Sequence, residues 1–163
     1  MVRINLIRKR YLADQHLNAE WDESFMLLGH MLKFPFSIDK VPLNYCLGTG
    51  HIKFFTDKAR FVFRNLEMIG KEMERRGFKP NWDLYWDYYD RCSIKLGMSQ
   101  WNDYKPSKDD EVIIIIRLIE KHELKPNYYK YCGKLLNSHK TFILLYKLLR
   151  VYLYRNIYIF TYL

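Results

Sequence analysis

Three ionisable residues recur at helical spacing near the start of the chain. His16, Glu20 and Glu23 fall at positions i, i+4 and i+7, so on a helix they form a polar stripe beside an apolar face. A carboxylate in such a stripe can stabilise a developing cation or accept a proton. Judged from these residues alone, the stripe borders solvent or a ligand and is more typical of a solvated helix face than of a catalytic centre.

The metal-ligating and nucleophilic residue types do not cluster elsewhere. No two of the five histidines lie one helical turn apart with a carboxylate between them, as a zinc site on a helix would require. The three cysteines are widely separated and include no Cys-x-x-Cys pair. We therefore expect reduced thiols and a chemistry that uses no metal and no other cofactor.

The charge of the chain indicates a polyanionic partner. Its 163 residues include 27 Lys and Arg against 18 Asp and Glu, a formal charge of +9, which attracts nucleic acid or anionic lipid. Aromatic residues make up 17% of the sequence, which suits base stacking as well as an aromatic core. The start of the chain lacks the apolar stretch of a signal peptide, so an intracellular protein is expected.

Two amphipathic helices are predicted in the first half of the chain. The first covers about residues 14–33, with Asp14 as its N-cap. The second covers about residues 56–76, and Gly77 is placed to end it. Their buried faces are expected from Leu17, Trp21, Phe25, Leu28 and Leu32, and from Val62, Leu66, Ile69 and Met73.

A third helix is predicted after Ser107, extending to about His122. Ser107 and Asp110 resemble a capping box. The consecutive apolar residues 112–116 would equally suit a strand, but the cap favours a helix. Its buried face is expected from Val112, Ile115 or Ile116, and Ile119.

The connections between these helices are predicted to be long and irregular. Residues 34–55 contain two prolines and two glycines, a density typical of a connection instead of a helix. Residues 78–106 are rich in Trp and Tyr but show neither helical nor strand periodicity, which predicts an irregular segment pinned by aromatic packing. The expected fold is therefore a mainly α single domain of about three helices.

Residues 137–163 form an apolar and basic C-terminal extension of unknown role. Lys147, Arg150 and Arg155 interrupt its apolar run, so no stretch approaches the roughly 18 uncharged residues that a membrane span needs. The segment could pack as an extra helix or lie on a membrane surface. Packing is the favoured interpretation.

Several short motifs occur together in a defined order and spacing. They comprise residues 3–6 (Arg-Ile-Asn-Leu), 12–17 (Leu-Ala-Asp-Gln-His-Leu), 47–51 (Leu-Gly-Thr-Gly-His), 54–55 (Phe-Phe), 75–78 (Arg-Arg-Gly-Phe) and 129–131 (Tyr-Lys-Tyr). Taken together, this set resembles the bacteriophage endonuclease V family of pyrimidine-dimer DNA glycosylases. The resemblance covers about residues 1–136.

The resemblance implies both a fold and an activity. It implies a compact helical domain over residues 1–136 whose N-terminal arm packs between helices, and a glycosylase that is also an AP lyase. The nucleophile would be the α-amine of Val2 after removal of Met1, attacking C1′ of a deoxyribose at a cyclobutane pyrimidine dimer. An imine would form, and β-elimination would then cleave the strand. Glu23 matches the catalytic carboxylate of the family.

An N-terminal amine is a chemically reasonable nucleophile for this reaction. The reference pKa of an α-amine is near 7.7–8.0 and that of lysine near 10.4, so more of the α-amine is neutral at cellular pH. The imine and the sugar that precedes it are cationic. A nearby carboxylate therefore stabilises both, and it can then accept the C2′ proton.

The resemblance also implies contacts with damaged double-stranded DNA by a protein that is expected to be monomeric. Gln15 and His16 match residues that contact DNA near the lesion. Arg3, Arg117 and Lys121 match residues that hold phosphates, and Tyr128 and Lys130 match residues that lie beside the DNA. Each has a structural alternative, as a partner at a helix start, a surface charge or a packed aromatic residue.

Two positions depart from the family pattern. Asp22 and Met26 stand where the family usually has arginines. Asp22 would place like charge near the DNA backbone at a cost of roughly 1–2 kcal/mol, unless Arg8, Lys9 and Arg10 compensate. The active enzyme therefore has two rivals, a non-catalytic DNA-binding protein of the same fold and a glycosylase/lyase for abasic or other lesions.

Overall fold

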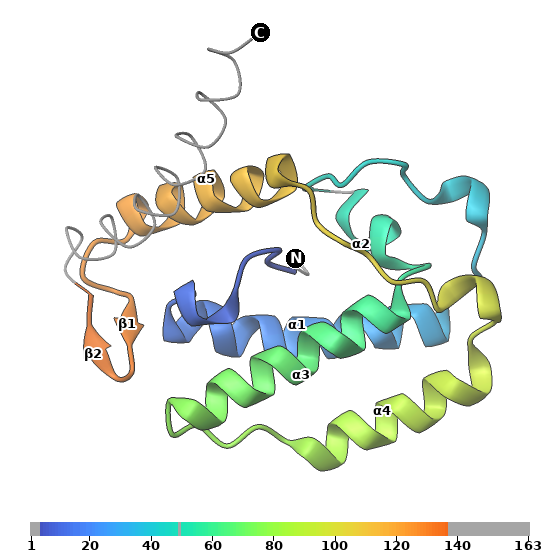
Figure 1. Ribbon diagram of the computed structural model, residues 1–163, viewed down its shortest axis with the longest axis horizontal. Helices are drawn as coiled ribbons and strands as arrows, with labels where there is room; N and C mark the ends of the chain where they lie inside the picture. Colours follow the sequence, from blue (N-terminus) through green and yellow to red (C-terminus); the bar gives the residue numbers. More distant parts are fainter. Residues whose placement is uncertain (1–3, 49, 137–163) are drawn as a thin grey trace, which may run out of the picture. The chain divides into compact units, whose positions relative to one another are not determined.

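The computed structural model describes residues 4–48 and 50–136, which divide into two compact units. Of the described residues, the first unit comprises Ile4 and residues 16–105, and the second comprises residues 5–15 and 106–136. The described residues form five α-helices, short 3-10 turns and one two-stranded sheet (Figure 1). The predicted mainly α class is confirmed.

The first unit contains most of the helices. Its elements in chain order are α1 (Asp14–Lys33), η2 (Ile38–Lys40), α2 (Gly50–Phe55), α3 (Ala59–Arg75), α4 (Trp82–Lys95) and η3 (Met98–Gln100). The first two residues of α1 belong to the second unit.

Helices α1 and α3 correspond to the first two predicted helices. The bounds of α1 agree with the prediction, and its apolar face is buried except for the half-buried Leu32. All four residues predicted to face the core from α3 are buried. Gly77 adopts a positive φ of 83°, and the Phe78 amide donates to the Met73 carbonyl at 2.9 Å. The left-handed glycine therefore ends α3, as predicted.

Helix α4 corrects the prediction of an irregular segment after Phe78. The Asn81 side chain caps it by accepting from the Leu84 amide at 3.0 Å. Its aromatic residues do not share one face, because Tyr85 is buried while Trp86 is 57% exposed. The helical period was hidden in the sequence because large apolar rings occupy both the core side and the solvent side of the helix.

Helix α2 and the short η2 turn correct the prediction of a helix-free connection before Phe55. Six residues make less than two turns, too few to produce a recognisable period. Phe54 and Phe55 are buried, and their rings meet edge to face at 5.1 Å. Tertiary packing stabilises this helix, which local sequence signals did not indicate.

The three long helices of the first unit meet around a glycine. A Cβ atom at Gly70 of α3 would lie 2.6 Å from Trp82 Cζ2 and 3.2 Å from Trp21 Cζ3. The two indoles contact each other edge to face at 5.6 Å. The absence of a side chain at residue 70 therefore lets tryptophans from α1 and α4 pack on α3.

The second unit combines the N-terminal arm (residues 5–13), which includes the 3-10 turn η1 (Lys9–Tyr11), with α5 (Lys108–Leu124). The predicted capping box is present, since the Asp110 amide donates to Ser107 Oγ at 3.2 Å and the Ser107 amide to Asp110 Oδ2 at 2.8 Å. The buried residues of α5 are Ile114, Ile115 and Leu118. The predicted face was therefore turned by about one residue, because a run of consecutive apolar residues does not fix the phase of a helix.

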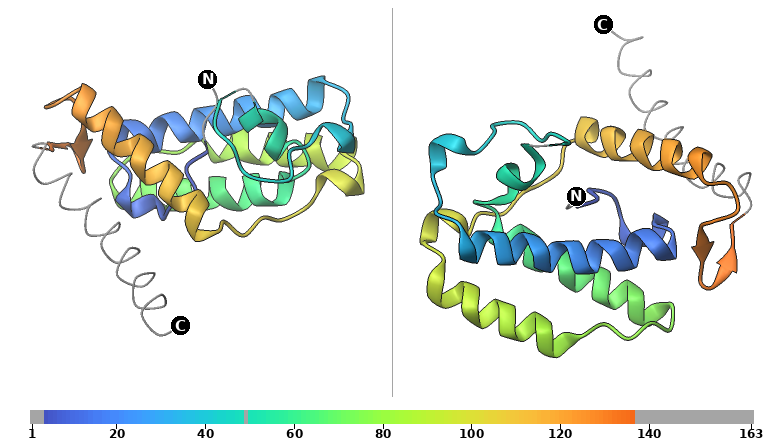
Figure 2. Two further views of the ribbon diagram at one scale, coloured as in Figure 1. Left: turned by 90° about the horizontal axis from the view of Figure 1, so that it is seen from above. Right: turned by 180° about the vertical axis from the view of Figure 1, so that it is seen from behind.

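A β-hairpin follows α5 in the second unit. It pairs β1 (Lys130–Tyr131) with β2 (Lys134–Leu135) in antiparallel register. Cys132 and Gly133 both have positive φ, as the two residues of a tight hairpin turn require. Asp14 accepts from both turn amides, at 3.1 Å and 2.8 Å, which fixes the hairpin beside the start of α1 (Figure 2).

No helix in residues 4–48 and 50–136 is both long and apolar enough to cross a bilayer. The predictions for residues 137–163, an extra packed helix or a membrane-surface segment, lie outside the described residues.

Candidate active site

Two carboxylates of α1 have different surroundings. Glu20 is 1% exposed and accepts from Asn65 Nδ2 of α3 at 2.8 Å. Glu23 is half-buried. Glu20 therefore ties α1 to α3, and Glu23 is the carboxylate of the predicted stripe that solvent can reach.

The start of the described chain is held by α2. The Ile4 amide donates to His51 Nε2 at 2.9 Å, and the Tyr45 hydroxyl donates to the Ile4 carbonyl at 3.5 Å. Ile4 is completely buried. The backbone is therefore anchored close after the predicted nucleophile, while Val2 and Arg3 themselves lie outside the described residues.

The hydrogen bonds of His51 define its tautomer. Because Nε2 accepts from the Ile4 amide, the ring proton sits on Nδ1, which donates to the Cys46 carbonyl at 3.2 Å. A protonated imidazole would lose the acceptor that holds Ile4. The contact between His51 and Ile4 has no signal in the sequence, because the two residues lie 47 positions apart and no local pattern links them.

The second unit brings together three of the residues predicted to contact DNA. Gln15 Nε2 donates to the Tyr128 carbonyl at 2.8 Å, and Gln15 Oε1 accepts from the Lys130 amide at 2.9 Å. Both ends of the Gln15 amide therefore hold residues 128–130, which lead into β1. These contacts fit the structural alternative for Gln15, which is a hydrogen-bonding partner near the start of α1.

Arg117 contacts the arm within the second unit. Its guanidinium donates to Asn5 Oδ1, and its side chain is half-buried on α5 together with that of Lys121. Arg117 thus positions the arm, and a guanidinium with five N–H donors can also bind a phosphate.

His16 is another residue predicted to contact DNA. It lies in the first unit and is also half-buried.

A basic and aromatic surface surrounds the hairpin. Tyr128 is 52% exposed, and the Lys125 ammonium lies 5.1 Å from the centre of its ring. Lys130 and Arg10 are exposed, and the Tyr131 hydroxyl donates to the Arg10 carbonyl at 3.0 Å. This arrangement offers a flat ring and several cations to a polyanion.

The three basic residues of the arm are not equivalent. Arg8 and Arg10 are exposed, but Lys9 is 5% exposed and its ammonium donates to the Asn5 carbonyl at 2.5 Å. Lys9 therefore supports the arm from inside. Of the three arm residues that were expected to compensate for Asp22 and Met26, only Arg8 and Arg10 are exposed.

Metal-ligating residue types stay apart throughout the described part of the chain, with no group of three or more that could hold an ion. Cys46, Cys92 and Cys132 are thiols. Burial raises the pKa of Cys92 to about 11, which keeps that thiol protonated and unreactive.

These features describe a mainly helical, basic protein with an accessible carboxylate on α1 and an anchored N-terminal arm. A family model described as pyrimidine dimer DNA glycosylase matches residues 1–85, more than half of the chain. The chain belongs to this family of DNA-repair glycosylases, which confirms the resemblance inferred from the motifs. The match includes Gln15, His16 and Glu23, but it ends before Arg117 and the hairpin.

Proposed function

We propose that this protein is a pyrimidine-dimer DNA glycosylase and AP lyase whose nucleophile is the α-amine of Val2, exposed by removal of Met1. The observation that carries the proposal is the family match over residues 1–85, which contains both this amine and Glu23. The anchoring of Ile4 and the accessibility of Glu23 beside the buried Glu20 support it.

The proposed reaction begins with attack of the neutral Val2 amine on C1′ of the 5′ deoxyribose of the dimer. The C1′–N bond to the base breaks, and the base leaves with the electron pair and takes the proton that the amine gives up. The C1′–O4′ bond then breaks, O4′ takes a proton, and the opened sugar remains joined to the amine nitrogen as a cationic imine. The Glu23 carboxylate stabilises the cationic species and accepts the C2′ proton, after which the C3′–O bond breaks by β-elimination. Kinking the duplex and extruding a nucleotide cost about a few kcal/mol, least at a damaged step.

In this proposal, cations hold the DNA backbone. Arg3, Arg117 and Lys121 neutralise phosphates, while Tyr128 and Lys130 lie beside the duplex. Each neutralised phosphate releases counterions and steepens the salt dependence of binding.

Borohydride trapping tests the proposed nucleophile directly. Protein whose mature N-terminus is shown to be Val2 by mass spectrometry is mixed with an oligonucleotide that carries a dimer or an abasic site, and reduction should fix a covalent adduct. Protein that retains Met1 is the matched control. If the demethionylated protein gives no adduct, it is not an amine-dependent lyase.

The Glu23→Gln variant tests the carboxylate. Because the uncharged amide cannot take the C2′ proton, strand cleavage should slow by about 10²–10⁴-fold. Glu20→Gln is the control, since an amide at residue 20 can still accept from Asn65. Equal losses in the two variants would show that Glu23 has no special role in the chemistry.

A second candidate is a protein of the same fold that binds DNA without excising dimers. The exposed Asp22 and the 61% exposed Met26 favour it, because the resemblance predicts phosphate-binding arginines at both positions. Duplexes with a dimer, an abasic site or no lesion separate the candidates. Binding without cleavage of any duplex supports the second, and cleavage of abasic sites alone indicates a lyase with a different lesion range.

A further inference from the structure

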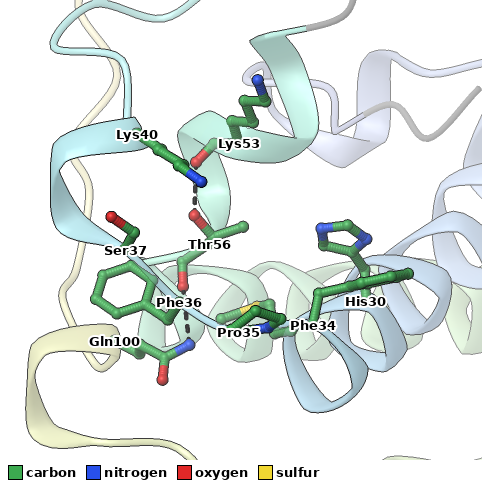
Figure 3. A pocket seen from close by; sticks show the side chains of 10 residues that line it. His30, Phe34, Pro35, Phe36, Ser37, Lys40, Lys53, Thr56 and Gln100 are labelled. Atoms are coloured by element: carbon green, nitrogen blue, oxygen red, sulfur yellow. Dashed lines mark hydrogen bonds between the residues drawn. The ribbon is translucent and has the colours of Figure 1, made fainter.

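A hollow of about 130 Å³ lies in the first unit, where the end of α1 and the chain after it face α2 (Figure 3). This volume is far above the roughly 10–15 Å³ that a single ordered water needs. Met31, Phe34 and Phe36 give it apolar walls, and Lys40 and Lys53 stand at its border. It can therefore take a small group that combines an apolar side with negative charge.

Part of the wall is built from polar groups that are already hydrogen-bonded. Gln100 is 7% exposed, its Nε2 donates to the Thr56 carbonyl at 3.3 Å, and its Oε1 accepts from the Gly97 amide at 3.3 Å. The Thr56 hydroxyl donates to the Lys53 carbonyl at 2.7 Å. These bonds hold the end of α2 and leave the lysine side chains as the main polar groups for a ligand.

The charge in the hollow is entirely positive. No carboxylate is among the described residues that line it, and neither Lys40 nor Lys53 forms an ion pair within the described part of the chain. Lys40 extends from η2 toward Thr56, while the Lys53 side chain leaves α2 and points away from Thr56 (Figure 3). Ser37 and His30 add a hydroxyl and a ring nitrogen to the same lining.

We propose that this hollow is a phosphate-binding subsite. Two lysines that line the same hollow make it favourable to an anion, because no carboxylate among the described lining residues offsets their positive charge. A phosphate has several oxygens to offer to two lysines and a hydroxyl, and lysine binds phosphate as a point charge. Phe34, whose ring packs 4.5 Å from that of His30, flanks the site with apolar surface for the sugar.

The subsite shares a helix with Glu23, and both belong to the first unit. His30 follows Glu23 by seven residues on α1, which places it on the same helix face about 10 Å further along. That distance corresponds to about three nucleotides of a duplex at 3.4 Å each. Assigning the phosphate to the DNA substrate rests on the proposed function, and there Lys40 and Lys53 would replace arginines absent at Asp22 and Met26.

The salt dependence of DNA binding tests the assignment to DNA. Binding of a lesion-bearing duplex by the full chain is measured by fluorescence anisotropy over a range of salt, for wild type and for a Lys40→Ala, Lys53→Ala double variant. Losing one phosphate contact should reduce the slope of log K against log salt by about 0.9. Lys71→Ala, at an exposed position of α3 outside the hollow, should leave the slope unchanged.

Titration with inorganic phosphate tests the site without DNA. Amide resonances of residues 37, 40 and 53 should shift with phosphate but not with chloride at the same ionic strength, and the double variant should lose the shifts. Shifts together with a reduced DNA slope identify a backbone phosphate. Shifts with an unchanged slope identify a site for free phosphate esters.

An unchanged DNA slope together with no phosphate-specific shifts overturns the proposal. Melting curves of the variants check that they remain folded, since the replaced lysines border the hollow and do not fill the core. Neither measurement requires cleavage. A failure of borohydride trapping would therefore count against the proposed function and leave the subsite to be judged on its own data.

Discussion

The two units of the molecule are stabilised by different kinds of interaction. In the first unit, aromatic rings from separate helices pack together, as where Trp21 meets Trp82 at 5.6 Å and Phe63 stacks on Trp101 at 5.7 Å. In the second unit, polar side chains bond to backbone groups far along the sequence. Asp14 reaches the amides of Cys132 and Gly133 in this way.

This difference determines which changes each unit tolerates. Ring packing depends on volume and shape, so an added atom in the wrong place is costly. A side-chain-to-backbone bond depends on one or two atoms and on their charge, so truncation or protonation removes it. The first unit should be sensitive to steric changes, and the second to polar and pH changes.

Among the polar contacts, the largest expected effect is the loss of the Asp14 carboxylate. Asp14 is 5% exposed and accepts from two turn amides, so Asp14→Ala should lower the free energy of unfolding by about 2–3 kcal/mol. Urea denaturation measures this. The Asp14→Asn variant keeps one acceptor oxygen and should lose less stability than Asp14→Ala. If both variants lose the same amount, the negative charge of Asp14 adds nothing to its bonds with the turn amides.

A methyl group at residue 70 tests the steric half of the comparison. Gly70→Ala gains about 1 kcal/mol of helix propensity, but its Cβ would meet both Trp82 and Trp21, and overpacking costs about 1–3 kcal/mol. A net loss of about 1–2 kcal/mol is expected in thermal unfolding. Gly29→Ala on α1 is the control, because its Cβ would find Tyr88 Oη at 3.5 Å, and it should be neutral or stabilising.

The parts of the fold that sequence could predict are those with a long, regular apolar period. Helix α1 has such a period, and α5 has a capping box at Ser107, so both were found. Helix α4 was missed because Tyr85 and Trp86 put large rings on opposite sides of it. A helical period can be recognised in a sequence only when one side of the helix is polar, and α4 presents aromatic residues to solvent.

The candidate site was predictable only as far as the family motifs reach. The resemblance predicts roles for Glu23 and Gln15, but it gives no sign that Gln15 bonds to the backbone of Tyr128, 113 positions away. The hollow beside Lys40 and Lys53 has no signal in the sequence either. Its lysines come from separate elements, and only folding places them on the same cavity.

Acidification should affect the second unit before the first. His122 of α5 stacks on Tyr129 at 4.0 Å, and burial lowers its pKa from 6.5 to about 4. The unfolded chain therefore binds more protons between these values, and stability falls as pH drops from 6.5 toward 4. Full conversion of this shift would be about 3 kcal/mol, and partial exposure of the ring reduces the expected loss to about 1 kcal/mol.

In the first unit, ion pairing lowers the pKa of the Glu72 carboxyl. Hydrogen bonds from Arg75, with a further bond from Arg76, hold the pKa of Glu72 below 4.5 against the opposing effect of burial. The contribution of Glu72 to stability is therefore kept above pH 4.5 and lost below it.

Measurements at two pH values test the role of His122. The free energies of unfolding at pH 7 and pH 5 should differ in the wild type but much less in the His122→Phe variant. If the difference is the same in both proteins, the acid-sensitive group lies elsewhere.

The smallest effect is expected for a polar contact on the surface of the first unit. Arg64 of α3 donates to Asp103 at 2.6 Å and to the Tyr104 carbonyl at 2.9 Å, and both charged side chains are more than 40% exposed. Because water competes for these groups, Arg64→Ala should cost only about 0.5 kcal/mol, and less at high salt. Phe61→Ala, which removes a buried ring beside Tyr104, should cost about 3–5 kcal/mol in the same urea experiment. If the arginine variant lost as much as the phenylalanine variant, polar contacts would matter as much in the first unit as in the second, and the contrast between the units would fail.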